Sequence, residues 1–324
     1  EKRSFIISLY MLGPHIGLLA AMALGGWIAQ EFGWRIVFIV FGAPGILLAL
    51  ILYVFCRDPG LGIYDTKAER AIRNQPKGNF FENVMGIMTT KGFFLICMGT
   101  AIAGIVGYGY AIWAPTFMVR NFDVSLAHAG LLFGIASGIF AAIGSIFSGY
   151  YCDKLSRKDS RWQLRMPLIG LLISIPFGLG FVLWPAEAAW QLGSVTVPHA
   201  IVFAAGFSLF NSWWPTLAFA AVSHLVSSNQ RATSIAILSL FLTLFGAGFG
   251  PLLTGTLSDI FSENADGEGL KMALVIMLSL LTTSAWFYYK AIKPYQQHMI
   301  KVQKCADINA DIEAMGSEPP VAIK

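Results

Sequence analysis

Charged residues are scarce in this sequence. They make up 12% of its 324 residues, whereas a typical soluble domain carries about 25%. Hydrophobic residues make up 56%, and they gather in long stretches that are almost free of charge. A helix needs roughly 20 apolar residues to cross the hydrocarbon core of a membrane. We therefore expect an all-α membrane protein whose eight membrane-spanning helices cover residues 4–30, 36–56, 92–118, 125–151, 166–185, 198–222, 232–257 and 270–289.

The same stretches lack polar faces. A soluble protein with long buried helices would repeat polar residues with a period of about 3.6, and a channel would carry a polar stripe along one helix. An intramembrane enzyme would need paired catalytic groups at helical spacing, such as two histidines four residues apart with a glutamate between them. None of these patterns occurs in the eight stretches. We therefore expect neither an enzyme nor a channel, and no cofactor or metal.

Cysteine is also scarce, with four residues at Cys56, Cys97, Cys152 and Cys305. Their spacing indicates no pairs, and three of them lie near basic ends of spans on the side expected to be reducing, so we expect free thiols. A starting methionine and a signal peptide are missing as well, because the first residue is Glu1. We interpret this as the absence of the protein's own beginning.

Lysine and arginine are distributed unevenly between the two sides of the membrane. If the spans alternate from an inner start, 19 of the 22 basic residues lie on inner segments. Only Arg35, Arg120 and Lys271 lie outside. The positive-inside rule then puts both termini in the cytoplasm, and we expect a multi-pass protein of a bacterial inner (plasma) membrane. The net charge of +4 then fits a belt against membrane lipids and indicates no nucleic-acid partner.

A charged motif follows the fourth expected span at the inner face. Residues 149–158 read Gly-Tyr-Tyr-Cys-Asp-Lys-Leu-Ser-Arg-Lys. Gly149 allows two helix ends to approach closely. Asp153 can pair with Lys154 and Arg157, or with the positive end of a neighbouring helix, and either pairing would form an inner latch that breaks when this side opens. The alternative is a basic cluster that only fixes the orientation of the chain.

Small residues recur in steps of about four in two spans. Such spacing puts them on one helix face and allows close backbone contact with another helix. Arg3 and Arg231 precede these two spans at nearly the same distance, which indicates a weak internal repeat. Ordinary packing of membrane helices is the alternative. The residues are Gly13, Gly17, Ala21, Gly25 and Gly26 in the first span and Gly246, Gly250, Pro251 and Gly255 in the seventh.

The 149–158 motif resembles the G-x-x-x-D-[RK]-x-x-R-[RK] loop of the major facilitator superfamily. The layout is similar too, because the only long polar stretch between spans follows two helices and precedes six. The resemblance covers nearly all of residues 1–290. Further strings resemble the spinster-like branch of this superfamily: Gly33-Trp34-Arg35, Phe41-Gly42-Ala43-Pro44-Gly45, Trp113-Ala114-Pro115 and the run from Gly248 to Asp259.

This resemblance implies a major facilitator fold of twelve helices, of which the first four are absent. Residues 1–56 would be the last two helices of the N-terminal six-helix bundle, and 57–91 a cytoplasmic linker. Residues 92–289 would form the C-terminal six-helix bundle, followed by a cytoplasmic tail at 290–324. The resemblance also implies a lipid-like substrate and protons as the coupling ion, although the coupling residues of the family would lie in the absent helices.

In such a fold the third and sixth spans line a central cavity. Tyr110 and Trp113 are three residues apart on the third span, which predicts a shared face. Asn211 adds an amide on the sixth, and an amide that faced lipid without a partner would be costly, so this face should border the cavity. Packing or an interfacial aromatic belt is the alternative. The predicted substrate-binding residues are Tyr110, Trp113, Phe207, Asn211, Trp214 and His15, although a histidine such as His15 is more often packed.

An aromatic wall with one amide and no fixed charge fits an amphipathic or lipid-like solute. A sugar acid or another organic anion usually needs arginine or lysine. We therefore expect a monomeric secondary active transporter that moves such a solute by alternating access. The alternatives are an organic-anion or sugar-acid carrier of the same superfamily, with its cations in the absent helices, and a membrane scaffold that transports nothing.

Overall fold

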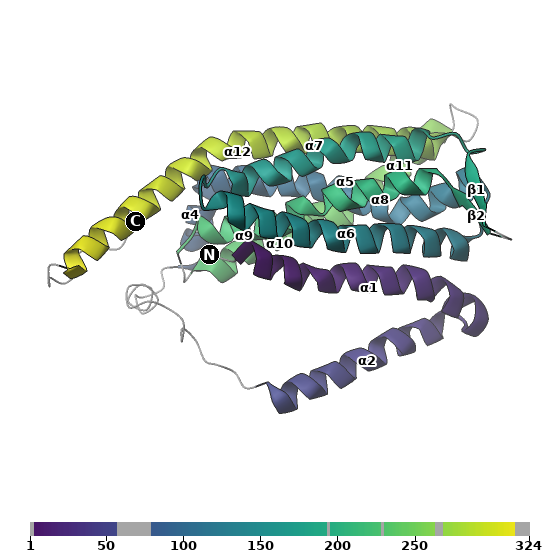
Figure 1. Cartoon of the computed structure of the whole chain (residues 1–324), viewed down its shortest axis with the longest axis horizontal. Coiled ribbons are helices and arrows are strands. Elements are labelled where there is room, and N and C mark those ends of the chain that lie inside the picture. Colours follow the sequence, from purple (N-terminus) through teal and green to yellow (C-terminus); the bar gives the residue numbers. More distant parts are fainter. Residues whose placement is uncertain (1–2, 57–78, 193–194, 228–229, 263–267, 315–324) are drawn as a thin grey trace.

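The computed structural model describes residues 3–56, 79–192, 195–227, 230–262 and 268–314. Almost all of them are helical (Figure 1). The chain begins with α1 (Arg3–Phe32) and α2 (Trp34–Phe55), and a short α4 (Phe80–Thr89) precedes the remaining elements. These are α5 (Lys91–Phe122), α6 (Leu126–Ser156), α7 (Trp162–Leu183), the strands β1 (Ala189–Leu192) and β2 (Val195–Pro198), α8 (Ala200–Asn211), α9 (Trp213–His224), α10 (Arg231–Phe241), η2 (Leu242–Phe249), α11 (Gly250–Ser262) and α12 (Gly269–Ala314).

Seven helical segments of the described chain are long and apolar enough to cross a membrane. They begin within four residues of seven of the eight predicted starts. The exception is the predicted span 198–222, which consists of α8 and α9, two helices of 12 residues that meet at Ser212. Pro215 explains the break, because it lacks the N–H that would bond to the carbonyl of Asn211 in a continuous helix.

Helices α5 to α12 form one bundle, and α1 lies along α6 at its edge (Figure 1). Helix α2 runs back beside α1 and away from the bundle (Figure 1), and none of its residues is buried. Where these helices meet, Gly25 of α1 faces Val37 and Phe41 of α2, while Gly26 faces Ala127 of α6. Helix α1 therefore joins α2 to the bundle through its contact with α6.

Glycines bring η2 and α11 against α5. A β-carbon added at Gly250 would lie 2.5 Å from the carbonyl oxygen of Ile105, and one at Gly246 would lie within 3.2 Å of the α5 backbone. A β-carbon at Gly255 would lie 2.9 Å from the ring of Trp113. The segment η2 itself is wound as a π-helix, a local widening that is common at functional sites. These glycines of the seventh predicted span thus lie at a close helix–helix contact.

Two glycines of α1 lie away from the helix contacts of the described residues. Within these residues no atom lies within 4 Å of a β-carbon added at Gly13 or Gly17. The close approach of α1 to α6 depends instead on Gly130, Gly134 and Gly138 of α6, where an added β-carbon would lie 3.0, 2.9 and 2.7 Å from atoms of α1. The side chains of α1 fill the space that these α6 glycines leave, so α1 needs no glycine of its own there.

Two segments outside the predicted spans have regular structure. Between the predicted spans 166–185 and 198–222, the strands β1 and β2 form an antiparallel pair in which Trp190 lies opposite Val197. Helix α12 does not end near residue 289 but continues through Pro294 to Ala314. Helix α12 is therefore continuous across residue 290, where the tail was predicted to begin. Of the predicted linker 57–91, residues 57–78 lie outside the described residues, and α4 occupies much of the rest.

Candidate functional site

The start of α1 is held by a carboxylate from the end of α6. The backbone N–H of Ser4 donates to Asp153 Oδ1 at 3.1 Å, and the N–H of Phe5 donates to Asp153 Oδ2 at 2.8 Å. The first N–H groups of a helix have no partner within the helix and carry partial positive charge. A carboxylate at this position satisfies two of them and is stabilised by the helix dipole. The sequence left two kinds of partner open for Asp153: the nearby Lys154 and Arg157, or the positive end of a neighbouring helix. The structure shows hydrogen bonds to the start of helix α1.

Buried polar groups surround this contact. The Ser4 hydroxyl lies 3.3 Å from Gln163 Nε2 of α7, which also donates to the carbonyl oxygen of Leu217 in α9 at 3.4 Å. The Cys152 thiol donates to Gln163 Oε1 at 3.4 Å. Ser4 is fully buried and Gln163 is 2% exposed. The start of α1 is thus connected to three helices of the bundle, α6, α7 and α9.

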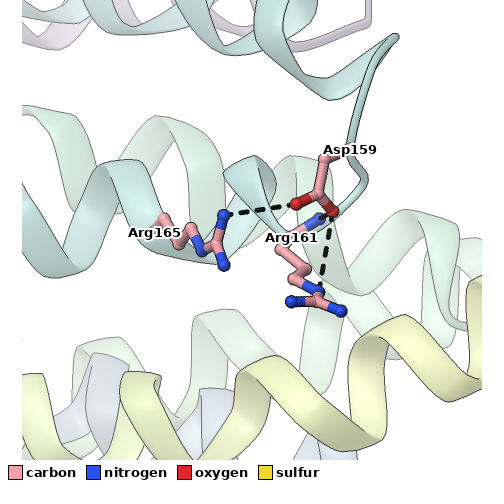
Figure 2. A network of polar contacts seen from close by, with 3 residues as sticks. All are labelled: Asp159, Arg161 and Arg165. Atoms are coloured by element: carbon pink, nitrogen blue, oxygen red, sulfur yellow. Dashed lines mark hydrogen bonds and ion pairs between the residues drawn. The ribbon is translucent and has the colours of Figure 1, made fainter.

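Of the other predicted latch residues, Gly149 lies at the contact between α1 and α6, whereas Lys154 and Arg157 point to the surface. A β-carbon at Gly149 would lie 2.7 Å from the Ser8 side chain, so the missing side chain lets α1 approach the end of α6. Lys154 and Arg157 have exposed side chains. The ion pairs drawn in Figure 2 belong to Asp159, the acid of the α6–α7 loop, which the sequence analysis did not single out.

Asp159 organises the loop between α6 and α7. One carboxylate oxygen accepts from Arg165 Nη1 at 3.2 Å, and the other accepts from the backbone N–H of Arg161 at 2.9 Å and lies 3.8 Å from its Nε (Figure 2). All three side chains are about one-third exposed or more. Such pairs add little stability, but they position the loop at the start of α7. The guanidinium of Arg165 also lies 5.8 Å from the centre of the Trp162 ring.

Two of the predicted aromatic residues, Tyr110 and Phe207, meet where a side chain of α8 packs on α5. The ring of Tyr110 lies 4.2 Å from that of Phe207, measured between centroids, and also contacts Phe133 and Phe181. Tyr110 is only 2% exposed, and its hydroxyl has no hydrogen-bond partner within the described part of the chain. A buried hydroxyl without a partner is costly. Tyr110 therefore brings an unsatisfied polar atom into an apolar cluster of four helices.

Asn211 and Trp214 lie together one helical turn from this cluster. The indole N–H of Trp214 donates to Asn211 Oδ1 at 3.3 Å. Both side chains lie over Gly107 of α5, where an added β-carbon would be 3.6 Å from Asn211 Nδ2 and 4.0 Å from the Trp214 ring. Trp214 is 4% exposed, whereas Asn211 is half-buried. The structure thus brings together Tyr110, Phe207, Asn211 and Trp214 of the predicted set.

Trp113 and His15 lie apart from these four. The indole N–H of Trp113 donates to the carbonyl oxygen of Pro251 at 2.9 Å, so this side chain packs on α11 rather than on α8. The prediction that Tyr110 and Trp113 share a face is wrong: the two rings contact different helices. His15 is half-buried on α1, and its carbonyl oxygen would lie 3.3 Å from a β-carbon at Gly138 of α6.

The structure adds residues that the sequence analysis missed. Ser137 of α6 is 5% exposed and its hydroxyl has no hydrogen-bond partner within the described residues. It lies one turn along α6 from Phe133, which contacts Tyr110. Gly107 provides the space over which Asn211 lies. A serine inside an apolar span gave a weak signal, whereas the glycine steps at 130, 134 and 138 were visible in the sequence.

Comparisons with known proteins agree with this architecture. Residues 1–220 match the Major Facilitator Superfamily. An MFS-type efflux pump of Mycolicibacterium smegmatis is 26% identical over 304 residues, which are 93% of this chain and 66% of that protein. Protein spinster homolog 1 of Xenopus tropicalis is 22% identical over 80% of this chain and 49% of its own length. A probable L-galactonate transporter of Escherichia coli is 23% identical over 84% of this chain and 56% of its own length.

A solved structure is similar as well. It is that of a bacterial homolog of the human lysosomal transporter Spinster in an inward-facing, unoccupied conformation. It matches with a TM-score of 0.66 and 24% sequence identity, over 90% of this chain and 71% of the other. The chain spans about half to two thirds of the length of the curated relatives named above. Because the family match covers more than half of its residues, this multi-pass membrane protein belongs to the Major Facilitator Superfamily.

Proposed function

We propose that this chain belongs to a secondary active transporter that moves a small amphipathic solute by alternating access and performs no chemistry on it. The observation that carries the proposal is the docking of α1 on α6, where Asp153 holds the first N–H groups of α1. Alternating access requires a contact that forms and breaks at one face of the membrane. Two hydrogen bonds confined to one helix end provide such a contact, since only the first turn of α1 has to leave the carboxylate for both to break.

The residues around Asn211 support an amphipathic solute. Rings of Tyr110, Phe207 and Trp214 offer apolar contact, and the half-buried amide of Asn211 offers a polar group beside them. The hydroxyls of Tyr110 and Ser137 lack partners within the described chain, so a polar atom of the solute would relieve their cost. We propose that these five residues form one wall of the solute site.

A carrier of organic acids is the second candidate. A probable L-galactonate transporter is among the relatives of this chain, and sugar acids carry a carboxylate. A carboxylate is usually bound by arginine or lysine, and the wall described above carries neither. Transport of an organic acid therefore requires a cation from outside this wall. An amphipathic solute requires only the aromatic rings and polar groups that the wall presents.

The experiment is uptake by the full-length protein that contains this chain, reconstituted into liposomes. A lysophospholipid and L-galactonate are offered in parallel, each with and without an imposed pH gradient. The proposal expects uptake of the lysophospholipid that increases with the proton gradient. Uptake of L-galactonate alone would favour the second candidate, and uptake of neither would overturn both.

Two substitutions test the wall itself. Asn211→Leu and Trp214→Ala should each weaken uptake about five-fold, because a lost hydrogen bond costs about 1 kcal/mol. Leucine is readily accepted in a membrane helix, so folding should survive, and elution as a single sharp peak in detergent checks this. Trp184→Ala is the matched control, since Trp184 packs on Phe203 at the far end of the bundle. If both variants transport like the parent, these residues only pack the helices together and do not bind the solute.

The remaining expectations concern placement and assembly. We propose that both termini lie in the cytoplasm of a bacterial plasma membrane, that protons are the coupling ion, and that the transporter is a monomer. The cytoplasmic placement of the termini rests on the 19 basic residues assigned to one side and on the positive-inside rule. The division into an N-terminal pair of helices, a linker, a bundle and a tail likewise stays a prediction.

A further inference from the structure

A cavity of about 470 Å³ lies at the lysine- and arginine-rich face of the bundle. One wall is the loop after α6, with Arg157, Lys158 and Ser160. The opposite wall is the part of α12 that continues beyond the predicted span, with Met299 and Ile300. The cavity thus joins two segments far apart in the sequence, and neither contributes to the proposed solute wall.

The position of this cavity along the membrane normal follows from α5. Helix α5 begins at Lys91, and a β-carbon added at Gly92 would lie 3.6 Å from the backbone nitrogen of Tyr295 in α12. Ile300 is five residues further along α12, which at 1.5 Å per residue is roughly 8 Å beyond the start of α5. The polar headgroup region of a bilayer occupies about that depth on each side. If the hydrocarbon core ends at the start of α5, the cavity therefore lies at the level of lipid headgroups.

The loop wall of the cavity is positively charged. Lys158 is exposed on it, and Arg157 adds a second cation. Asp159 also lines the cavity, but its carboxylate is engaged by Arg161 and Arg165 (Figure 2). The lining part of the loop, residues 156–160, therefore carries two cations and one acid that is already paired. An anionic ligand fits this wall.

The α12 wall has a different character. Met299 is half-buried and Ile300 is 46% exposed, so apolar surface faces the basic loop across the cavity. A free phosphate ion would gain nothing from this surface. A phospholipid would use both walls, because its phosphate lies beside the start of its acyl chains. Basic pockets beside membrane helices bind anionic headgroups for this reason.

We propose that this cavity binds the headgroup of an anionic phospholipid, with Lys158 on its phosphate and Met299 and Ile300 against its glycerol and upper acyl chain. The bound lipid joins the α6–α7 loop to the extension of α12. This places a lipid beside the end of α6, which carries Asp153, independently of which solute the protein moves.

The test measures lipid binding to the full-length protein in detergent by native mass spectrometry. Phosphatidylglycerol and phosphatidylcholine with identical acyl chains are titrated separately, and inorganic phosphate is added as a competitor. The proposal expects phosphatidylglycerol to bind more tightly than phosphatidylcholine. Phosphate that displaces phosphatidylglycerol at equal concentration would show a site for the free anion and overturn the lipid assignment.

Matched lysine substitutions locate the site. Lys158→Gln should weaken phosphatidylglycerol binding about five-fold, the contribution of one basic residue near an anionic membrane surface. Lys304→Gln removes the same charge from an exposed position on α12 that does not line the cavity, and should change binding little. Ile300→Glu, which replaces apolar surface with an acid, should weaken it at least as much as Lys158→Gln. Equal effects of Lys158→Gln and Lys304→Gln, or no effect of Ile300→Glu, would show a diffuse charge effect and refute the site.

Discussion

Replacing Asp153 with asparagine tests the contact on which the proposed transport cycle depends. The carboxylate accepts from the N–H groups of Ser4 and Phe5 at 3.1 and 2.8 Å. Asparagine has nearly the same shape and keeps one acceptor oxygen, but it loses the second acceptor and the negative charge. We expect Asp153→Asn to favour the state in which α1 separates from α6 at the basic face.

The size of this effect follows from the two hydrogen bonds. A hydrogen bond to a charged group contributes about 1.5–3 kcal/mol, and a charge at a helix N-terminus contributes about 0.3–1 kcal/mol, or up to about 2 kcal/mol when it is partly buried. Asp153 is half-buried, and the variant keeps one bond. We expect a loss of about 1–2 kcal/mol, which shifts a two-state equilibrium about 5- to 30-fold.

A buried reporter can measure the shift. Ser8 is fully buried between α1 and α6, and its side chain would lie 2.7 Å from a β-carbon at Gly149. Ser8→Cys is close to isosteric and should react with a membrane-impermeant maleimide only when the two helices separate. In a background with the native cysteines replaced, the labelling rate then follows the population of the open state. Asp153→Asn should raise it about 5- to 30-fold.

Asp159→Asn is the matched control for this experiment. It removes the same charge from the loop that follows α6, but Asp159 contacts Arg161 and Arg165 rather than α1. We expect it to leave the labelling rate of the Ser8→Cys reporter nearly unchanged. An unchanged rate in Asp153→Asn, with normal expression and elution, would show that the motif only fixes orientation. An equal rise in both variants would point to the charge of the loop and not to the helix cap.

Two further predictions concern orientation and packing. A cysteine at Asp123, between α5 and α6, should react with an impermeant thiol reagent added to intact cells, whereas one at Asn79 should not; labelling of Asn79 would reverse the orientation. Gly138→Ala should lower the thermal unfolding midpoint of the full-length protein, because its β-carbon would lie 2.7 Å from the Leu19 side chain and overpacking costs about 1–3 kcal/mol. Gly92→Ala, whose β-carbon would meet its neighbours at 3.6 Å or more, should leave the midpoint nearly unchanged, and equal changes in the two variants would contradict the packing argument.

The starts of the membrane spans could be predicted because charge is excluded from lipid. The first span was expected at 4–30 and the structure has Ser4–Ala29; the second was expected at 36–56 and the structure has Trp34–Phe55. The same argument fails where no lipid limits the helix. Nothing in the hydrophobic pattern ends α12 near residue 289, since a helix can continue into water with lysines along its surface. The break at Ser212 was missed for a related reason, because both of its sides are equally apolar.

Contacts between helices were harder to predict than the helices themselves. Residues three apart differ by about 60° around a helix axis, which is enough for Tyr110 to contact α8 while Trp113 contacts α11. The spacing of Asn211 and Trp214 was a better guide, since the two side chains bond to each other within one turn. What glycine spacing can predict is limited for a different reason. The spacing predicts a close approach but not which helix supplies the side chain that fills the space, and the described residues bring no atom within 4 Å of a β-carbon added at Gly13 or Gly17.

The two ends of the contact between α1 and α6 differ in kind, and this difference bears on how the helices could separate. At the basic face the contact includes the charged cap at Asp153 and the buried hydrogen bonds of Gln163. Toward the other end it rests on glycines such as Gly134, packed against Met22, where the attraction is non-directional. Opening the basic face therefore breaks specific bonds, while the contact at the glycine end does not depend on one fixed angle between the helices. We infer that α1 rotates about the glycines of α6 and that the cap sets the population of the two states.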